Sequence, residues 1–463
     1  MPERSGGRIP VAKEYQDVSA FNKDTEKVFA GEDTGMYQRY DYKELAADEK
    51  EFAKMIGVPD SALFNSGMAA IHTAIEVEGL EPQDVVLCSQ EIYGVTKDYV
   101  NSLKKRGIRV QYFDPSDIQE LKKIVQTRKP RLILAETVAN SKEMKMVDLS
   151  AYAEIIGNAS ERYKNEFSPE KVLREQLQVF LKLKGIDKNP TTELVQEIST
   201  AIDSFKHGDP KALMPAIKKI EEELGITPRG EVSRWLLNRV QMIGLTARRD
   251  ISLILDNTLP SPVLINPVEH LGAVNTNMTV VESGTKHFQD GKNAITMGIV
   301  YSKDQDRVKK AKNLRIQAGS YLQSTSEAEI SHDIIDTMPE KMKKHSENAL
   351  KLARILEEKG LTVYHPNLDS HPQHKLANEM APNGAVTLFY VDIPEDISDR
   401  DEFMDKVKKA GGENIGLGSS FGHKKTWLSN FSLGDRTIRI AVGMESPEEF
   451  GKVVNAFEKA INN

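Results

Sequence analysis

Short apolar segments alternate with amphipathic segments between residues 61 and 137 of the chain. Residues 84–89 (DVVLCS), 109–114 (RVQYFD) and 131–137 (RLILAET) are apolar runs typical of buried strands. Between these runs, residues 93–107 and 117–129 have the apolar spacing of helices, and residues 61–79 are interpreted as a turn followed by a helix. This alternation predicts a mostly parallel sheet covered by helices on both faces.

The alternation breaks at residue 151, beyond which helical patterns follow one another up to residue 248. Leu194, Ile198 and Ile202, for example, fall on one helical face. Strand patterns resume at residues 250–257 (DISLILDN) and 277–283 (NMTVVES). We therefore predict an all-helical insertion, residues 151–248, within a large domain of residues 61–304.

Beyond residue 305 the pattern is that of a smaller α+β domain. Strands are expected at residues 385–393 and 437–444, and Ser446, Pro447 and Glu449 predict a last helix that begins with a capping box. The predicted fold class is α/β, with a mostly parallel mixed sheet, a C-terminal α+β domain of residues 305–463 and an N-terminal arm of residues 1–60.

Composition excludes several classes of protein and leaves the α/β prediction unchanged. The 463 residues carry a net charge of −7, which gives no indication of a nucleic-acid partner. The N-terminus has no apolar signal segment, and no run approaches the length of a membrane span, so a cytoplasmic protein without a membrane partner is expected. The single cysteine, Cys88, lies in a strand pattern and is interpreted as a core residue, and the ten histidines show no metal-like pairing.

Four features fall where open α/β sheets bind ligands, at strand ends and helix starts. Gly67 in FNSGMAA opens a helix, whose free N–H groups at residues 67–69 attract phosphate. Asp256 ends a buried strand, where a charge is costly to bury, so it either caps a local turn or faces a positive group. Ser283 and Thr285 precede Lys286 in SGTK, and Tyr93 ends a strand where it could stack on a planar ring.

Pyridoxal phosphate is the cofactor that needs all four features together. Its phosphate requires donors, its aldehyde condenses with a lysine, its ring can be stacked, and its pyridine nitrogen is kept protonated by a carboxylate. Each feature alone has a plainer explanation, such as a surface lysine, a turn, a capping aspartate or a core aromatic residue. Their joint occurrence favours a cofactor site.

Motifs along nearly the whole chain outside the insertion resemble the Cys/Met-metabolism branch of fold-type I pyridoxal phosphate enzymes, the group of cystathionine γ-synthase, cystathionine lyase and methionine γ-lyase. The matching stretches are YQR at 37–39, NSGMAAIHTAI, YGVT, ETVANSKEMKMVD, LILDNTLPSP, VESGTK and SLGDRTIRIAVGMES. The resemblance implies a Schiff base at Lys286, pairing of Asp256 with the pyridine nitrogen, and stacking and proton transfer by Tyr93. It further implies phosphate binding by Gly67, Met68, Ser283 and Thr285, a contact of Asn140 with the phenolic oxygen, and binding of the substrate carboxylate by Arg439.

The same resemblance implies that the active site is shared between subunits. In this family the Tyr-X-Arg that Tyr37 and Arg39 match reaches the cofactor phosphate of a neighbouring subunit, although composition alone suggests a solvated loop here. The family pattern implies a homodimer with shared sites that pairs into a tetramer.

Departures from the family pattern gather on the substrate side. YQR is followed by YDYKEL, QDGKNA follows the lysine, and Gly416-Leu417-Gly418 replaces the usual Ser-Leu-Gly, which removes a hydroxyl near Arg439. Val95 takes the place of the cysteine that methionine γ-lyases carry. The prolines usual around Asn140 are also absent.

We therefore expect an enzyme of transsulfuration-type metabolism that catalyses β/γ-elimination or γ-replacement on a cystathionine-like or O-activated homoserine substrate. The choice between lyase and transferase, and the role of the insertion, stay open. The alternative hypothesis is a non-catalytic binding or scaffolding protein on the same frame that uses the helical insertion as its interaction surface.

Overall fold

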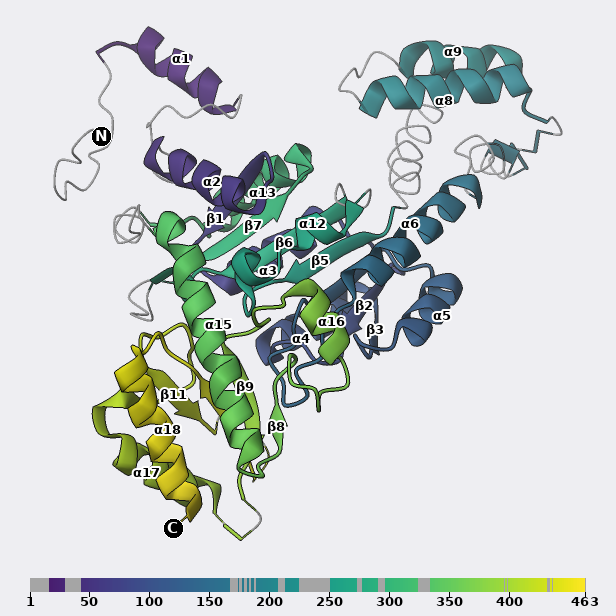
Figure 1. The fold of residues 1–463 in the computed structure, drawn as a ribbon. Coiled ribbons are helices and arrows are strands. Elements are labelled where there is room, and N and C mark those ends of the chain that lie inside the picture. The colour runs from purple at the N-terminus through teal and green to yellow at the C-terminus, as the bar shows by residue number, and fades with distance from the viewer. Residues whose placement is uncertain are drawn as a thin grey trace. The chain divides into compact units, whose positions relative to one another are not determined.

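The computed structural model describes most of the chain as two compact units, residues 1–155 with 252–463, and residues 156–251. The described residues are 16–29, 43–166, 174, 177–178, 181–182, 185–186, 189–206, 213–224, 250–272, 277–289, 296–323, 334–394, 396–397, 399–430, 434 and 436–462. Figure 1 shows the arrangement of helices and strands within each unit.

A seven-stranded sheet forms the centre of the larger unit, in the order β1-β7-β6-β5-β4-β2-β3. The strands are β1 (Asp60–Phe64), β2 (Val85–Ser89), β3 (Arg109–Phe113), β4 (Leu132–Glu136), β5 (Ser252–Asp256), β6 (Met278–Ser283) and β7 (Gly298–Ser302). Only β7 runs antiparallel to its neighbours β1 and β6. The predicted mostly parallel mixed sheet is confirmed.

Helices bury this sheet through alternating side chains of its strands. Val86, Cys88, Leu134 and Ile254 belong to a buried cluster with Ile71 of α3 (Gly67–Val77). Their sequence neighbours Leu87, Ile133 and Leu255 are also buried, because a parallel sheet is covered on both faces. The other helices of this region are α4 (Gly94–Ser102), the 3-10 helix η2 (Leu103–Arg106), α5 (Ile118–Arg128), α6 (Leu149–Glu166), α11 (Ser261–Leu264), α12 (Pro267–His270), η5 (His287–Gln289) and α13 (Gln305–Ala318).

Two helices precede the sheet, α1 (Val18–Phe29) and α2 (Lys43–Ile56), and α2 packs on β1 of the same chain. Buried Glu49 of α2 accepts the N–H of Leu63 at 2.9 Å and pairs with buried Arg315 of α13 at 2.5 Å. The two buried charges therefore stabilise each other, and part of the expected N-terminal arm is tied to its own subunit.

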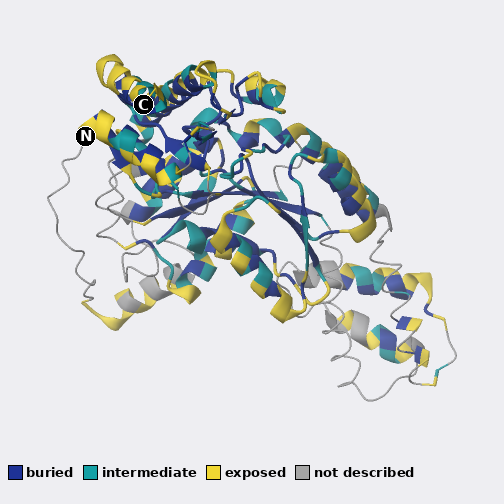
Figure 2. Ribbon diagram, turned by 90° about the horizontal axis from the view of Figure 1, so that it is seen from below, coloured by how far each residue is buried: buried dark blue, intermediate teal, exposed yellow. Residues whose placement is uncertain are grey.

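A second sheet of five strands lies in the C-terminal part, in the order β10-β11-β12-β9-β8. Its strands are β8 (Val363–Tyr364), β9 (Leu388–Asp392), β10 (Ile415–Leu417), β11 (Thr426–Ser429) and β12 (Thr437–Ala441). They share one buried cluster with α15 (Ile334–Glu358), α17 (Arg400–Gly411) and α18 (Pro447–Asn462), whose buried faces are dark blue in Figure 2. Helix α16 (His374–Met380) and η6 (Gly412–Asn414) complete this part.

The capping box expected before the last helix is confirmed. Ser446 donates its N–H to Glu449 Oε2 at 2.8 Å, and Glu449 donates its N–H back to Ser446 Oγ at 3.4 Å. Strands β1, β7, β8, β10 and β11 were not predicted. All five have at most five residues and lack a long apolar run, so their pairing depends on neighbours distant in sequence.

The smaller unit contains α8 (Thr192–Lys206) and α9 (Leu213–Leu224), which pack against each other. Leu194, Ile198 and Ile220 are buried between them, and Lys219 pairs with Glu197. The regular elements in the described part of this unit are helices. Trp235 lies outside the described residues.

Candidate active site

The carboxyl ends of β4, β5 and β6 meet the first turns of α3 and α4 around a cavity of about 250 Å³. Eight residues predicted from the sequence line it: Gly67, Met68, Tyr93, Asn140, Asp256, Ser283, Thr285 and Lys286. Arg439 lies near this cavity without lining it, whereas Tyr37 and Arg39 fall outside the described residues. The elements therefore bring together side chains that are up to 219 positions apart, from Gly67 to Lys286.

The start of α3 forms one end of the cavity and is suited to an anion. Ser66 caps the helix and accepts the N–H of Ala69 at 3.1 Å, so the prediction that the N–H of residue 69 is free was wrong. The N–H groups of Gly67 and Met68 begin the helix at its positive end. A Cβ at Gly67 would lie 3.0 Å from Ser283 Cβ, which explains the glycine by the close approach of α3 to β6.

Lys286 follows β6 in a turn that is packed from two sides. Thr285 Oγ1 accepts the N–H of Met297 at 3.1 Å. Gly422 has φ +84°, and a Cβ there would lie 2.6 Å from the carbonyl oxygen of Lys286. The lysine Nζ donates to Ser420 Oγ at 3.2 Å. Burial, followed by the nearby positive charge of Arg439, lowers the pKa of Lys286, which favours a neutral amine.

Two carboxyl groups stand side by side at the ends of β4 and β5, where Glu136 and Asp256 are register partners. Asp256 Oδ1 accepts the N–H of Thr258 at 3.0 Å, and burial raises the pKa of this aspartate. Burial and the charge of Asp256 raise the pKa of Glu136 to about 8. One of the two carboxyl groups is therefore protonated near neutral pH in the protein alone.

Glu136 was missed in the sequence, although it holds two predicted residues. Its Oε1 accepts the N–H of Tyr93 at 2.7 Å and its Oε2 accepts the N–H of Asn140 at 2.9 Å. The signal was present, because the buried strand in LILAET ends in Glu136 just as the buried strand in LILDNT ends in Asp256. Asn140 is also held at its side chain, where Oδ1 accepts the hydroxyl of Tyr390 at 2.8 Å.

On the substrate side, Arg439 of β12 lies beside the loop that carries Ser420. Its guanidinium donates to the carbonyl oxygen of Ser419 and, at 3.5 Å, to that of Ser420, the residue whose hydroxyl meets Lys286. Arg439 is therefore connected to Lys286 through Ser420.

The glycines of Gly416-Leu417-Gly418 lie under the indole ring of Trp427. A Cβ at Gly416 would be 2.6 Å from Trp427 Nε1, and one at Gly418 would be 2.2 Å from Trp427 Cζ3. His423 stacks on Trp427 with 3.9 Å between ring centroids. The missing serine hydroxyl is thus explained by the space that the tryptophan occupies.

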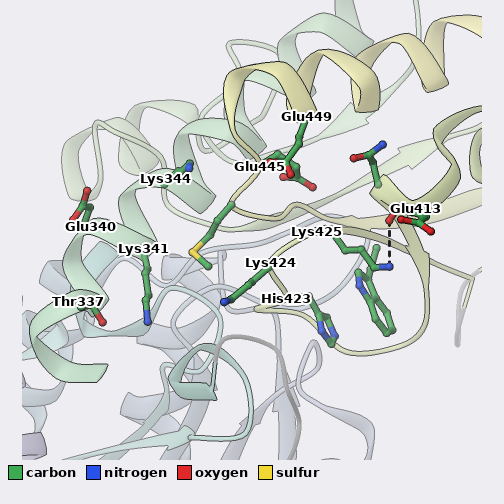
Figure 3. A pocket seen from close by; sticks show the side chains of 13 residues that line it. Thr337, Glu340, Lys341, Lys344, Glu413, His423, Lys424, Lys425, Glu445 and Glu449 are labelled. Carbon is green, nitrogen blue, oxygen red and sulfur yellow. Dashed lines mark hydrogen bonds between the residues drawn. The ribbon is translucent and has the colours of Figure 1, made fainter. Parts of the chain in front are cut away.

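A second, larger hollow of about 970 Å³ lies along α15 and the start of α18 (Figure 3). Four lysines line it, Lys341, Lys344, Lys424 and Lys425, together with four glutamates, Glu340, Glu413, Glu445 and Glu449, so its charges balance. Neither Lys286, predicted for catalysis, nor Asp256, predicted to bind the cofactor, lines it. The smaller cavity is therefore the candidate active site.

The family comparison decides which chemistry the cavity serves. The model of the Cys/Met metabolism PLP-dependent enzyme family matches residues 9–161 and 238–458. The chain belongs to this family. The unmatched stretch between the two segments falls within the smaller unit, residues 156–251.

Curated relatives agree with this membership. Cystathionine gamma-lyase of Bos taurus is 22% identical over 89% of this chain and 81% of the relative. Cystathionine beta-lyase of Neurospora crassa is 22% identical over 87% of this chain and 68% of the relative. The structure of cystathionine gamma synthase from Xanthomonas oryzae pv. oryzae superimposes with a TM-score of 0.63 at 17% identity, over 92% of this chain and 88% of that chain, and shows the shared fold.

The cavity of this PLP-dependent enzyme fits its cofactor. It combines a desolvated lysine amine, a buried carboxyl group and the open start of a helix, which are the groups that an aldehyde, a pyridine nitrogen and a phosphate require. Among the described residues there is no cluster of His, Cys, Asp and Glu that could hold a metal ion. The described helices also include none that is long and apolar enough to cross a membrane.

Proposed function

We propose that this enzyme acts on sulfur-containing or O-activated amino acids, by β/γ-elimination or γ-replacement on a cystathionine-like or homoserine-derived substrate. The observation that carries the proposal is one cavity lined by Lys286, Asp256 and the start of α3, in a chain that matches the Cys/Met family along most of its length. The curated relatives in this match are named for cystathionine cleavage.

Different cavity residues would bind different parts of the cofactor. Gly67, Met68, Ser283 and Thr285 would hold the phosphate, Tyr93 would stack on the ring, and Asn140 would donate to the phenolic oxygen. Asp256 would keep the pyridine nitrogen protonated, and when bound the cofactor supplies an electron sink for the bonds broken at the substrate α carbon.

Lys286 would first hold the cofactor and then act on the substrate. Its Nζ would accept the α proton of the substrate, because burial and the charge of Arg439 keep this amine neutral more readily than an exposed lysine. Ser420 Oγ, 3.2 Å from Nζ, orients the amine. Tyr93 stands at the cavity mouth, half exposed, where it can assist a second proton transfer.

Arg439 would bind the α-carboxylate of the substrate through its planar fork of donors. In the protein alone this fork donates to backbone carbonyl groups of the Ser420 loop. A substrate carboxylate, being charged, is the stronger acceptor and would exchange with them.

A substrate panel tests this proposal directly. Cystathionine, O-acetylhomoserine, O-succinylhomoserine, methionine and cysteine are incubated with the enzyme loaded with pyridoxal phosphate, and keto-acid and thiol products are read by mass spectrometry. Product from the wild type, with loss of both product and visible absorption in Lys286→Ala, supports the proposal. A wild type that binds no pyridoxal phosphate would overturn it.

The second candidate function, non-catalytic binding through the helical insertion, rests on the changes near the substrate site. The complete set of lysine, aspartate and tyrosine in one cavity favours the enzyme. Bound cofactor without product from any member of the panel would favour the scaffold.

We further propose a homodimer with shared active sites, paired into a tetramer. Tyr93 is 52% exposed at the cavity mouth of the single chain, which leaves room for a neighbouring subunit. An Arg39→Ala variant mixed with a Lys286→Ala variant is expected to regain part of the activity, since some hybrid sites combine two intact halves. Mixtures that stay inactive, with exchange of subunits verified by mass spectrometry, would contradict shared sites.

A further inference from the structure

Tyr390 of the C-terminal sheet joins the cofactor-side and substrate-side residues of the cavity. It lies on β9, is 2% exposed, and donates its hydroxyl to Asn140 Oδ1 at 2.8 Å. On the neighbouring strand β12 its register partner is Arg439, so the two side chains project from the same face of the sheet. One tyrosine is therefore next to residues with two different predicted roles.

The hydrogen bond fixes the direction of the Asn140 amide. The backbone N–H of Asn140 is already held by Glu136 Oε2 at 2.9 Å. Because the Tyr390 hydroxyl occupies the amide oxygen, the amide NH₂ is the group that Asn140 can present to the cavity that it lines. This is the orientation that donation to an anionic oxygen requires.

Arg439 is the register partner of Tyr390 on β12, so its positive charge lies close to the tyrosine side chain. Burial raises the pKa of Tyr390 to about 12, with the Arg439 charge opposing the rise. The hydroxyl thus keeps its proton throughout the neutral range, which suits a fixed donor and excludes a role as general base.

We propose that Tyr390 is a positioning residue that orients Asn140 toward the cofactor and Arg439 toward the substrate carboxylate. The inference rests on the function proposed above, because Asn140 and Arg439 meet cofactor and substrate only in that function. Strand β9 would thus link the two binding events, because the Tyr390 hydroxyl contacts Asn140 and Arg439 is the register partner of Tyr390.

Tyr390→Phe tests the inference because it removes only the hydroxyl. Cofactor-free protein titrated with pyridoxal phosphate and followed by fluorescence is expected to bind about three- to tenfold more weakly, the range that loss of one hydrogen bond produces. The visible absorption band of the bound cofactor shifts, since its oxygen loses an oriented donor. With an active substrate, KM rises more than kcat falls, as expected for a misplaced Arg439.

Tyr364→Phe is the matched control. Tyr364 is the register partner of Tyr390 on the adjacent strand β8, but it donates its hydroxyl to Asp392 Oδ2 at 2.8 Å, and neither Tyr364 nor Asp392 lines the cavity. This variant is expected to keep the wild-type affinity and absorption band. Thermal unfolding of both variants identifies any general loss of stability.

A double-mutant cycle with Asn140→Ala completes the test. If Tyr390 acts on the cofactor through Asn140, adding Tyr390→Phe to Asn140→Ala weakens cofactor binding no further. Fully additive weakening, or a Tyr390→Phe protein with wild-type affinity, band and KM, would overturn the inference. A wild type that binds no pyridoxal phosphate would instead overturn the proposed function, so the two failures are distinguishable.

Discussion

At the scale of single residues, the site depends on buried carboxyl groups that accept hydrogen bonds from nearby N–H groups. Glu136 accepts two backbone N–H groups and stands beside Asp256. Glu282, a buried residue of β6, accepts a hydrogen bond from Asn257 Nδ2 at 3.2 Å. A buried carboxyl group without such donors would be costly. Glu136 therefore positions Tyr93 and Asn140, although it is not itself expected to contact the cofactor.

Glu136→Ala is expected to weaken both folding and cofactor binding. The change leaves the N–H groups of Tyr93 and Asn140 without an acceptor, at about 1–3 kcal/mol for each buried group. Urea unfolding and a pyridoxal phosphate titration measure the two effects. Glu282→Gln is the control, and a Glu136→Ala protein with no larger loss of cofactor affinity than this control would contradict the positioning role.

The pKa of Glu136 also predicts a pH dependence. Its pKa rises from an ordinary value of 4.5 to about 8 on folding, so between these values the folded state binds more protons than the unfolded state. The free energy of unfolding of the cofactor-free protein therefore falls as pH rises from about 5 to 8, by up to about 1.4 kcal/mol per pH unit from this group.

Asp256 and Glu282, whose pKa values are also raised, contribute in the same direction. Glu136→Gln therefore isolates one contribution, and its unfolding free energy should change less steeply with pH than that of the wild type. Parallel curves for the two proteins in urea unfolding from pH 5 to 8 would show that Glu136 does not titrate in this range.

At the scale of elements, the C-terminal sheet shows how one aromatic side chain limits the size of the residues packed against it. Trp427 of β11 lies across β10, and parallel pairing places Gly416 opposite Trp427 in register. The ring fills the space of two side chains, which accounts for the departure from Ser-Leu-Gly without any reference to substrate.

Gly416→Ser is accordingly expected to destabilise the protein by about 1–3 kcal/mol through overpacking against Trp427. Gly434→Ser is the control, because a Cβ there would meet no atom within 4 Å. Thermal or urea unfolding compares the two variants. Trp427→Leu combined with Gly416→Ser should recover part of the loss, and no difference between the two glycine variants would contradict the packing explanation.

At the scale of the whole molecule, the two compact units predict an uneven response to the cofactor. The candidate site lies entirely in the unit of residues 1–155 and 252–463, and α8 and α9 form their own packed pair in residues 156–251. A ligand at one hundred times its dissociation constant stabilises the state that binds it by about 2.7 kcal/mol.

Hydrogen exchange measured with and without pyridoxal phosphate tests this response. Protection is expected to increase in α3, β4, β5 and β6 and to stay constant in α8 and α9. Equal gains in α8 and α9 would show that the insertion is coupled to the site.

The sequence by itself determined the strands and helices with long periodic patterns, from β2 to α5 and again at β5, β6, β9 and α18, because periodicity reports burial locally. It also indicated the cavity residues, since a glycine, hydroxyl residues, a lysine and an aspartate that occur together at strand ends and helix starts favour a cofactor site. Only the tertiary structure decided that Glu136 clamps Tyr93 and Asn140, that Tyr390 reaches Asn140 across 250 positions, and that Trp427 requires Gly416. These contacts join residues from separate strands, and no local pattern encodes which distant side chain fills a given space.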